Sequence, residues 1–293
     1  MRLALASYCP EWHPDWQAIE AKLDRWLAEA AAQGAALCVF PEYAGIEAVL
    51  VGTPGPCPGP SHWREAMCAA ADRWAELNSA LARRHGLHIL SGSLCAEEGG
   101  QTVNRAWLCA PDGSRSHQDK LIPTPYERDE LGVTGSRSLH LHDTALGHLG
   151  ILICYDSEFP LLARKFAVAG ADLLIVPSCT DLPAGQTRVR QSCRARAIEL
   201  QIAVAQAPLV GHVSGCDVVD TSTGRAGVFC PPDHGLPADG ILAQGEPDRP
   251  GWTFADIDLD AVSSARRAGQ VGNFRHWEEQ ESPPVSLHTA RLT

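Results

Sequence analysis

Short apolar runs rich in strand-forming residues recur along the chain and restrict its fold more than any other feature. Each run is four to seven residues long, which is the usual length of a strand and too short for a stable helix. Because the runs contain almost no polar residues, they predict strands that are buried on at least one face. The predicted strands span residues 3–6, 36–40, 87–93, 106–109, 149–153, 173–176, 202–205 and 254–257.

Helical patterns separate several of these strands. The first helix is predicted to follow Pro14 and to stop before Gly34, and the second to begin after Ser61 and to stop before Gly86. Both carry an apolar stripe that can cover a sheet. Further helices are predicted over 160–169 and 187–201, and turns between paired strands at 111–113 and 223–224. This mixture of helices and hairpins predicts an α/β fold in which helices are layered on sheets.

The composition argues against several classes of function. The formal net charge of −11 gives little support to a nucleic-acid partner. The eleven cysteines form no Cys-x-x-Cys pair, which argues against a zinc ribbon or a disulfide scaffold. The chain begins without the pattern of a signal peptide, and no stretch approaches the roughly 18 apolar residues of a membrane helix. We therefore expect a cytoplasmic protein with no nucleic-acid or membrane partner.

Cys154 stands where the apolar run 149–153 gives way to polar residues and to a helix that Pro160 begins. A side chain at such a strand end is held rigidly and faces a cleft. The free N–H groups of a nearby helix start favour a thiolate and a developing oxyanion. Taken alone, the segment is equally compatible with a buried structural cysteine.

Glu42 and Lys120 are two further candidate residues, of which Glu42 stands at a predicted strand end. Glu42 follows the apolar run 36–40, where a carboxylate is costly to bury unless it is paired or chemically needed. By itself, Glu42 also fits an ordinary turn after a strand. Lys120 precedes an apolar dipeptide and the proline-containing loop 123–125, and alone it would pass for a surface residue.

Taken together, these segments resemble the nitrilase superfamily of carbon-nitrogen hydrolases. The resemblance rests on Phe-Pro-Glu at 40–42, Asp-Lys-Leu at 119–121, and Ile-Cys-Tyr-Asp with Phe-Pro in the segment 153–160. Segments at 171–178, 194–199 and 256–259 are similar as well, so the resemblance extends over about residues 2–267. It implies a catalytic triad of Glu42, Lys120 and Cys154.

The resemblance further implies an architecture and a partner. The expected fold is a four-layer α-β-β-α sandwich, with residues 1–267 forming one carbon-nitrogen hydrolase domain. Self-association as a homodimer or larger oligomer is implied, through the helices on the cysteine side. We expect the tail 268–293 to dock on a partner subunit, because Phe274 and Trp277 have no evident role within the chain.

The resemblance also bears on specificity. A second glutamate is implied on the loop after the lysine, and Glu127 is the best match, with Glu130 as the alternative. Tyr-Asp after the cysteine looks like the amidase branches, whereas nitrilases more often carry Trp-Glu there. Tyr43, Tyr155 and Thr180 follow strand ends and are predicted to line the pocket of a small-molecule amide substrate.

The predicted reaction requires no cofactor and no metal. Glu42 accepts the thiol proton of Cys154, and the thiolate attacks the amide carbon. Lys120 and the backbone N–H of Tyr155 stabilise the oxyanion, and Glu127 orients Lys120. Water then hydrolyses the thioester, with Glu42 again acting as the base.

Several alternatives stay open at this point. Within the superfamily, a nitrilase or an N-acyltransferase would use the same triad. A metal hydrolase is suggested by His140 and His142, which would lie on one face of a possible strand, although no third ligand stands at a recognisable spacing. A non-catalytic binding protein could keep the fold without the reaction. The sequence does not identify which amide is the substrate.

Overall fold

The computed structural model describes residues 1–280 and 282–292. The first of its two large sheets contains six strands in the order β14-β1-β2-β3-β4-β5. Strands β1, β2 and β3 run parallel, while the others pair antiparallel with their neighbours. In chain order the strands are β1 (Arg2–Ser7), β2 (Leu37–Phe40), β3 (His88–Glu98), β4 (Gln101–Cys109), β5 (Arg115–Asp119) and β14 (Gly251–Asp256).

The second sheet also contains six strands, in the order β13-β12-β9-β8-β7-β6. Its centre is the parallel set β7, β8 and β9. The strands are β6 (His142–Thr144), β7 (Gly147–Ile151), β8 (Leu173–Ser178), β9 (Ala203–Pro208), β12 (Gly227–Phe229) and β13 (Ile241–Gln244). A separate hairpin pairs β10 (Gly211–His212) with β11 (Thr221–Ser222).

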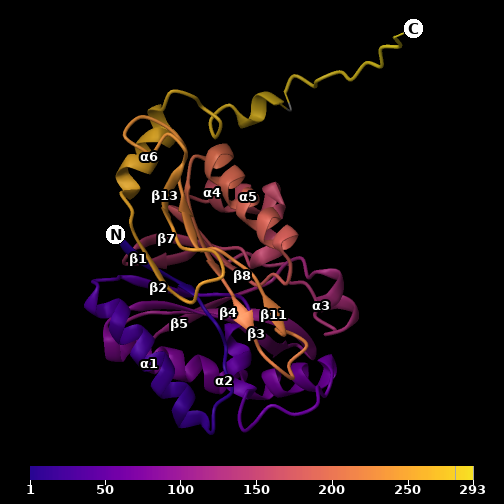
Figure 1. Cartoon of the computed structure of the whole chain (residues 1–293). Coiled ribbons are helices and arrows are strands. Elements are labelled where there is room, and N and C mark those ends of the chain that lie inside the picture. The colour runs from indigo at the N-terminus through magenta and orange to yellow at the C-terminus, as the bar shows by residue number, and fades with distance from the viewer. Residues whose placement is uncertain (281, 293) are drawn as a thin grey trace.

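Helices cover the outer face of each sheet, which gives the four layers α-β-β-α (Figure 1). Helices α1 (Trp16–Ala32) and α2 (Pro60–His85) pack on the first sheet, and α4 (Pro160–Val168) and α5 (Pro183–Leu200) on the second. The remaining helices are α3 (Pro125–Asp129), α6 (Leu259–Ala268), η1 (Ala44–Val49), η2 (Cys154–Glu158) and η3 (Trp277–Gln280). No helix of the described residues is long and apolar enough to cross a membrane.

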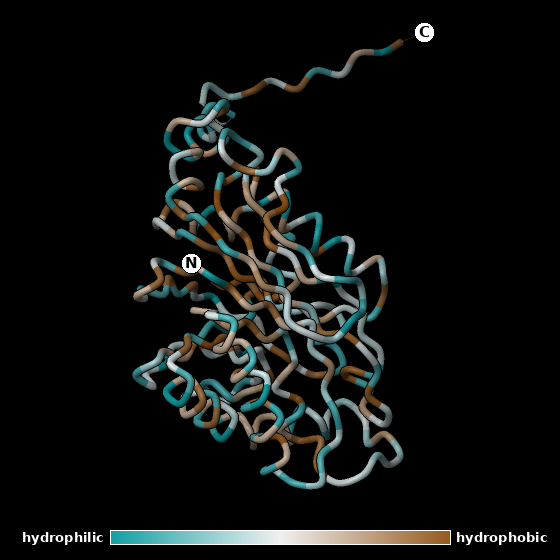
Figure 2. Tube along the Cα trace, turned by 60° about the vertical axis from the view of Figure 1, so that its left-hand side comes forward, coloured by the Kyte–Doolittle hydropathy of each residue, from teal (hydrophilic) through white to brown (hydrophobic). Residues whose placement is uncertain are grey.

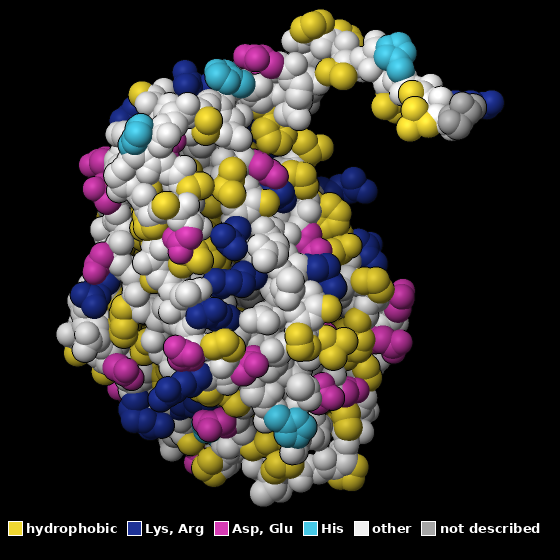
Figure 3. Space-filling model, turned by 45° about the horizontal axis from the view of Figure 1, so that its top comes forward, with side chains coloured by type: hydrophobic (Ala, Val, Ile, Leu, Met, Phe, Trp, Pro, Cys, Tyr) yellow, Lys and Arg dark blue, Asp and Glu magenta, His cyan; other side chains and the backbone are white. Residues whose placement is uncertain are grey.

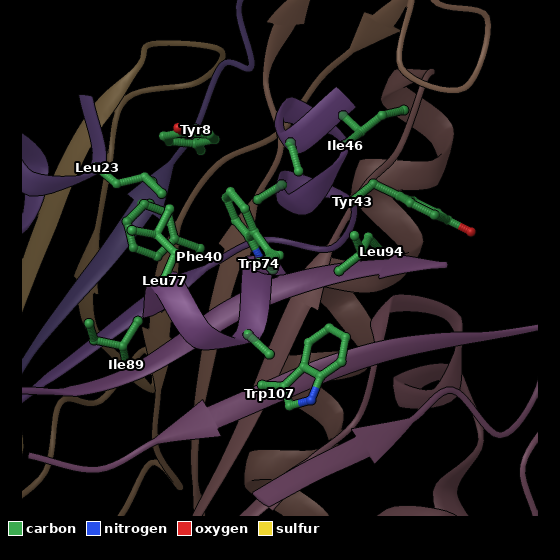
Figure 4. Close-up of a cluster of buried hydrophobic side chains, with 14 of the residues drawn as sticks. Tyr8, Leu23, Phe40, Tyr43, Ile46, Trp74, Leu77, Ile89, Leu94 and Trp107 are labelled. Carbon is green, nitrogen blue, oxygen red and sulfur yellow. The ribbon is translucent and has the colours of Figure 1, made fainter. Parts of the chain in front are cut away.

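The apolar runs of the sequence fill two cores. Alternate residues of β1 face opposite sides, so that Leu3 and Leu5 pack between the sheets while Ala4 and Ala6 pack under α1 and α2. Figure 2 shows the hydrophobic stretches gathered in the strands of the interior. In the helix-side core, Figure 4 shows Trp74 of α2 among side chains from the sheet.

The predicted strands and helices are confirmed, with differences at their ends. Strand β4 begins at Gln101 rather than at residue 106, and α5 begins at Pro183 rather than at residue 187. The predicted turn 111–113 does join the paired strands β4 and β5. The prediction that the turn at 223–224 joins paired strands is wrong. The strands on either side of it, β11 and β12, do not pair with each other, because β11 pairs with β10 while β12 pairs with β9 and β13.

The first part of the tail packs on its own chain. The guanidinium of Arg164 lies 4.3 Å from the ring centroid of Phe274 and 4.9 Å from that of Trp277, and the guanidinium of Arg266 lies 4.9 Å from the Phe274 ring. The backbone N–H of Phe274 also donates to the side chain of Gln201 over 3.3 Å. The expectation that these two aromatic residues have no role within the chain is therefore wrong.

Candidate active site

The four predicted catalytic side chains line one cavity of about 310 Å³ between the loops at the ends of the two sheets. Glu42 follows β2, Lys120 follows β5 directly, and Cys154 opens η2 after β7. Glu127 lies on α3, in the loop after Lys120. Segments separated by more than a hundred residues therefore contribute to a single site.

Lys120 is buried between two carboxylates. Its Nζ lies 2.7 Å from Glu42 Oε1 and 2.5 Å from Glu127 Oε2, and all three side chains are at most 3% exposed. Glu127 is fixed by a capping box at the start of α3, where the Thr124 hydroxyl accepts from the Glu127 N–H and the Thr124 N–H donates to Glu127 Oε2. The ammonium thus has a fixed position, which few surface lysines have.

Asn104 is a member of the site that the sequence did not predict. It lies on β4, is fully buried, and its Nδ2 donates to Glu42 Oε1 over 3.0 Å and to Glu127 Oε1 over 2.9 Å. It faces Lys120 across the β4–β5 ladder, where the Lys120 N–H donates to the Asn104 carbonyl. One amide therefore bridges both carboxylates that hold the lysine.

Cys154 has a backbone conformation that few non-glycine residues adopt, with φ of 48°. Cys154 is the first residue of η2, and the hydroxyl of Ser157 donates to its carbonyl over 2.6 Å. The Cys154 thiol donates to the Cys179 carbonyl at 3.5 Å, and Cys154 lines the same cavity as Glu42. The Cys179 N–H donates to Glu42 Oε2 over 3.0 Å, so the residue that follows β8 contacts both Cys154 and Glu42.

Asp156 joins the lysine loop to the cysteine turn. Its buried carboxylate accepts from the N–H groups of Leu121 and Ile122, which follow Lys120, and from the N–H of Ile153, which precedes Cys154. Burial raises the pKa of this carboxyl to about 7. Asp156 therefore holds together the segments that carry Lys120 and Cys154 without lining the cavity.

The charges of the site shift one another's proton affinities. Burial raises the pKa of Glu42, and the neighbouring Glu127 adds to this rise, although Lys120 opposes it. Burial alone would raise the pKa of Glu127 too, but the ammonium of Lys120 brings it below its usual range. The two carboxylates keep the pKa of Lys120 high despite its burial.

Burial and neighbouring charge also shift the pKa of the Cys154 thiol. Burial, followed by the charge of Glu42, raises the pKa of Cys154 well above its usual value. A thiol of raised pKa and a carboxyl group of raised pKa thus line the same cavity. Such a pair can transfer a proton from sulfur to oxygen as the sulfur attacks an electrophile.

The predicted pocket residues also line the cavity. Tyr43, Tyr155 and Thr180 all contribute to its wall. The Tyr43 hydroxyl donates to Glu127 Oε1 over 2.9 Å, and Figure 4 shows it directed away from the apolar cluster. Glu130, the alternative second glutamate, is exposed and does not line the cavity.

The two histidines of the metal hypothesis lie outside this cavity. His140 Nδ1 is 2.8 Å from the His117 carbonyl, and burial lowers the pKa of His142 to about 4. Among the described residues, only Glu11, His13 and Glu47 bring three potential metal ligands together. The ammonium of Lys22 already lies between the two carboxylates of that group, at 2.9 Å and 2.7 Å.

Comparison with known proteins identifies the family of the chain. The family model described as carbon-nitrogen hydrolase matches residues 2–234. The "Probable hydrolase YhcX" of Bacillus subtilis is 36% identical over 65% of this chain and 37% of its own length. The "Omega-amidase NIT2" of Danio rerio is 28% identical over 62% of this chain and 65% of its own. The matches thus span less than two thirds of either relative.

A solved structure with the same fold is a mutant of the amidase from Nesterenkonia sp. AN1, described with the acetamide moiety of fluoroacetamide added covalently at the active-site cysteine. It superposes with a TM-score of 0.69 at 26% identity, over 92% of this chain and 94% of the other. Saccharomyces cerevisiae Nit3 has a TM-score of 0.71 at 20% identity, over 92% of this chain and 93% of the other, and supports the fold. The chain belongs to the carbon-nitrogen hydrolase family, within the nitrilase superfamily.

Proposed function

We propose that the protein hydrolyses a small non-peptide amide through a thioester on Cys154, releasing ammonia or an amine and a carboxylic acid. The observation that carries this proposal is that the Cys154 thiol and Glu42 Oε2 both contact the backbone of Cys179, while Glu42 Oε1 contacts the buried ammonium of Lys120. A nucleophile, a base and a fixed positive charge are thereby available to one carbonyl group in the cavity.

Acylation begins with proton transfer. Glu42 takes the proton of Cys154 as sulfur attacks the carbonyl carbon, and the carbonyl oxygen becomes an oxyanion. Lys120 and the Tyr155 N–H stabilise this oxyanion, and a fixed ammonium in a desolvated site is worth more than one in water. Glu42 then gives its proton to the leaving nitrogen as the C–N bond breaks.

Deacylation uses the same groups in reverse. Glu42, again ionised, takes a proton from water as the water oxygen attacks the thioester carbon, and Cys154 leaves as a thiolate that regains the proton. Glu127 stays ionised throughout and keeps the ammonium of Lys120 in place. The depressed pKa of Glu127 and the raised pKa of Glu42 support this division of roles.

The test compares two cysteines of the same cavity. Cys179 also lines it, but only its backbone atoms contact Glu42 and Cys154. Cys154→Ala should abolish release of ammonia from small amides, and Cys179→Ala should retain it within a few-fold. Mass spectrometry of the wild type after rapid quenching should reveal an acyl group on the Cys154 peptide. Normal turnover by folded Cys154→Ala protein would refute the proposal.

The products of the same assay separate the alternatives. A nitrilase would release ammonia and acid from nitriles, and an N-acyltransferase would transfer the acyl group to an added amine in place of water. Chelators would inactivate a metal hydrolase. The expected result is release of ammonia from amides, with no hydrolysis of nitriles, no acyl transfer to the added amine and no inactivation by chelators.

We further propose that the protein self-associates in the cytoplasm. Large apolar side chains are exposed on and beside the outer helices of the second sheet, namely Leu161, Val168, Leu182 and Ile198. Figure 3 shows the last part of the tail standing clear of the body, and Val285, Leu287 and Leu292 on it are exposed. All eleven cysteines are free thiols, as in a reducing compartment. Light scattering should give at least a dimer mass.

A further inference from the structure

The outer wall of the catalytic cavity is strongly acidic. Besides the catalytic groups Glu42, Lys120 and Glu127, its charged lining residues are Glu158, Asp181, Asp217, Asp220 and Arg188. Four carboxylates thus oppose one guanidinium. They come from different elements, with Glu158 on η2, Asp181 after β8 and the last two aspartates between β10 and β11. A substrate that enters from solvent therefore passes a wall of net negative charge.

The single guanidinium of this wall is already engaged. Arg188 Nε lies 3.5 Å from Glu158 Oε2, and the Arg188 side chain is 62% exposed. A carboxylate on a substrate would have to compete with Glu158 for this cation and would meet three further carboxylates. Because Arg188 is exposed, an ion pair between it and a substrate carboxylate would also be weak, so Arg188 offers little attraction to an anion at this position.

Asp217 has an unused acceptor at the cavity. Its Oδ1 is buried and has no hydrogen-bond partner among the described residues. A buried carboxylate oxygen without a donor is unfavourable, which points to a donor supplied from outside the chain.

Tyr126 links Asp217 to the catalytic end of the cavity. The Tyr126 hydroxyl donates to the Asp217 carbonyl over 3.4 Å, and its sequence neighbour Glu127 contacts Lys120. Asp217 therefore lies about one tyrosine side chain away from the α3 backbone that carries Glu127. Burial raises the pKa of Tyr126, and the charges of Asp217 and Asp220 raise it further, which shows that the local potential is negative. The face of the Tyr126 ring is an additional site for a cation.

We propose that the substrate is an amide whose end remote from the scissile bond carries a protonated amine, bound by Asp217 and Asp220 beside Tyr126. This inference rests on the proposed amidase function. An ammonium supplies up to three donors for the carboxylates of Asp217 and Asp220, and it gains from the negative wall that would repel a carboxylate. A neutral amide would gain neither contact.

The kinetic test uses three small amides of similar length, namely δ-aminovaleramide as the cation, valeramide as the neutral compound and glutaramate as the anion. We expect kcat/KM to be about tenfold or more higher for the cation than for the anion. The double variant Asp217→Asn/Asp220→Asn should narrow this ratio several-fold, mainly through the KM of the cation, and should change the KM of valeramide less than that of the cation. High salt screens charges, so it should also narrow the ratio of kcat/KM between the cation and the anion.

The matched control is Asp143→Asn/Asp256→Asn, which removes the same charge from two exposed aspartates outside the cavity. This variant should keep the full cation preference. If it narrowed the ratio as much as the cavity variant does, overall charge rather than Asp217 and Asp220 would set the preference, and the inference would be overturned.

A binding measurement separates this inference from the reaction itself. Calorimetry on Cys154→Ala protein should give tighter binding of δ-aminovaleramide than of glutaramate. If wild-type protein hydrolysed none of the three amides while this difference in binding remained, the proposed reaction would fail and the charge selectivity would stand. Equal binding, preference for glutaramate, or no measurable binding of either compound overturns the inference.

Discussion

Replacing Asn104 tests whether the buried bridge between the two carboxylates sets the protonation of the base. Asn104→Leu keeps the approximate volume of the side chain but removes the donor that reaches Glu42 at 3.0 Å and Glu127 at 2.9 Å. Both carboxylates keep their contacts with Lys120. The change therefore removes one hydrogen bond from each anion and leaves the triad in place.

The size of the effect follows from the strength of such bonds. A hydrogen bond to a charged group contributes about 1.5–3 kcal/mol, and one pKa unit corresponds to about 1.4 kcal/mol. Losing the bond to Glu42 destabilises its ionised form, so its already raised pKa should rise further, by the shift that corresponds to this loss of free energy. Glu42 must be ionised to take the thiol proton, so activity is lost as the pH falls through this pKa. The acid limb of the profile should move to higher pH by that amount.

The assay is the pH profile of kcat/KM for a neutral amide, measured for the wild type, Asn104→Leu and the control Asn78→Leu. Asn78 is also fully buried, and its Nδ2 donates to the Trp74 carbonyl within α2, away from the cavity. We expect the control to lose stability and keep its acid limb. Asn104→Leu could instead lower the maximum kcat/KM without moving the acid limb of the pH profile. In that case Asn104 would only maintain the fold, and the reasoning about Glu42 would be refuted.

Three further predictions concern the lysine, the thiol and the tail. Lys120→Met should lower the single-turnover acylation rate by roughly two to three orders of magnitude with little change in substrate affinity, and weaker binding with normal acylation would make Lys120 a binding residue. Dialysis against a chelator should leave activity unchanged. A thiol-alkylating reagent should abolish activity, and mass spectrometry should locate the added group on the peptide that contains Cys154. Truncation after Arg267 should lower the melting temperature because it removes the contacts of Phe274 and Trp277, and an unchanged melting temperature would contradict their packing.

The positions of Glu42 and Cys154 could be predicted because each follows an apolar strand, whereas Lys120 follows the polar strand β5 and was indicated by the resemblance to a family. Ends of neighbouring strands meet at one edge of a sheet, so a local pattern carried information about a distant contact. The resemblance to a family then indicated that the three segments act together. The choice of Glu127 over Glu130 depended on the short helix α3, whose capping box points one glutamate inward and leaves the other exposed.

Asn104 could not be predicted in the same way. It lies inside β4, and asparagine is disfavoured in strands, so the sequence pattern placed the start of this strand after it. Its role depends on the register of the β4–β5 hairpin, which brings it opposite Lys120. A polar residue inside a strand whose neighbours are buried was the available signal, but its partners are 62 and 23 residues away in the chain.

The buried carboxylates explain how loops from two sheets can hold catalytic groups at fixed distances. Each carboxylate that approaches the catalytic groups accepts a backbone N–H from another segment or from its own helix start: Glu42 from Cys179, Glu127 from Thr124, and Asp156 from the residues around it. These bonds compensate part of the desolvation of the charges and at the same time fix the loops that carry them. The charges needed for the chemistry therefore also supply the rigidity of the site. A base of raised pKa can be kept beside a neutral thiol because the atoms around it have little freedom to relax.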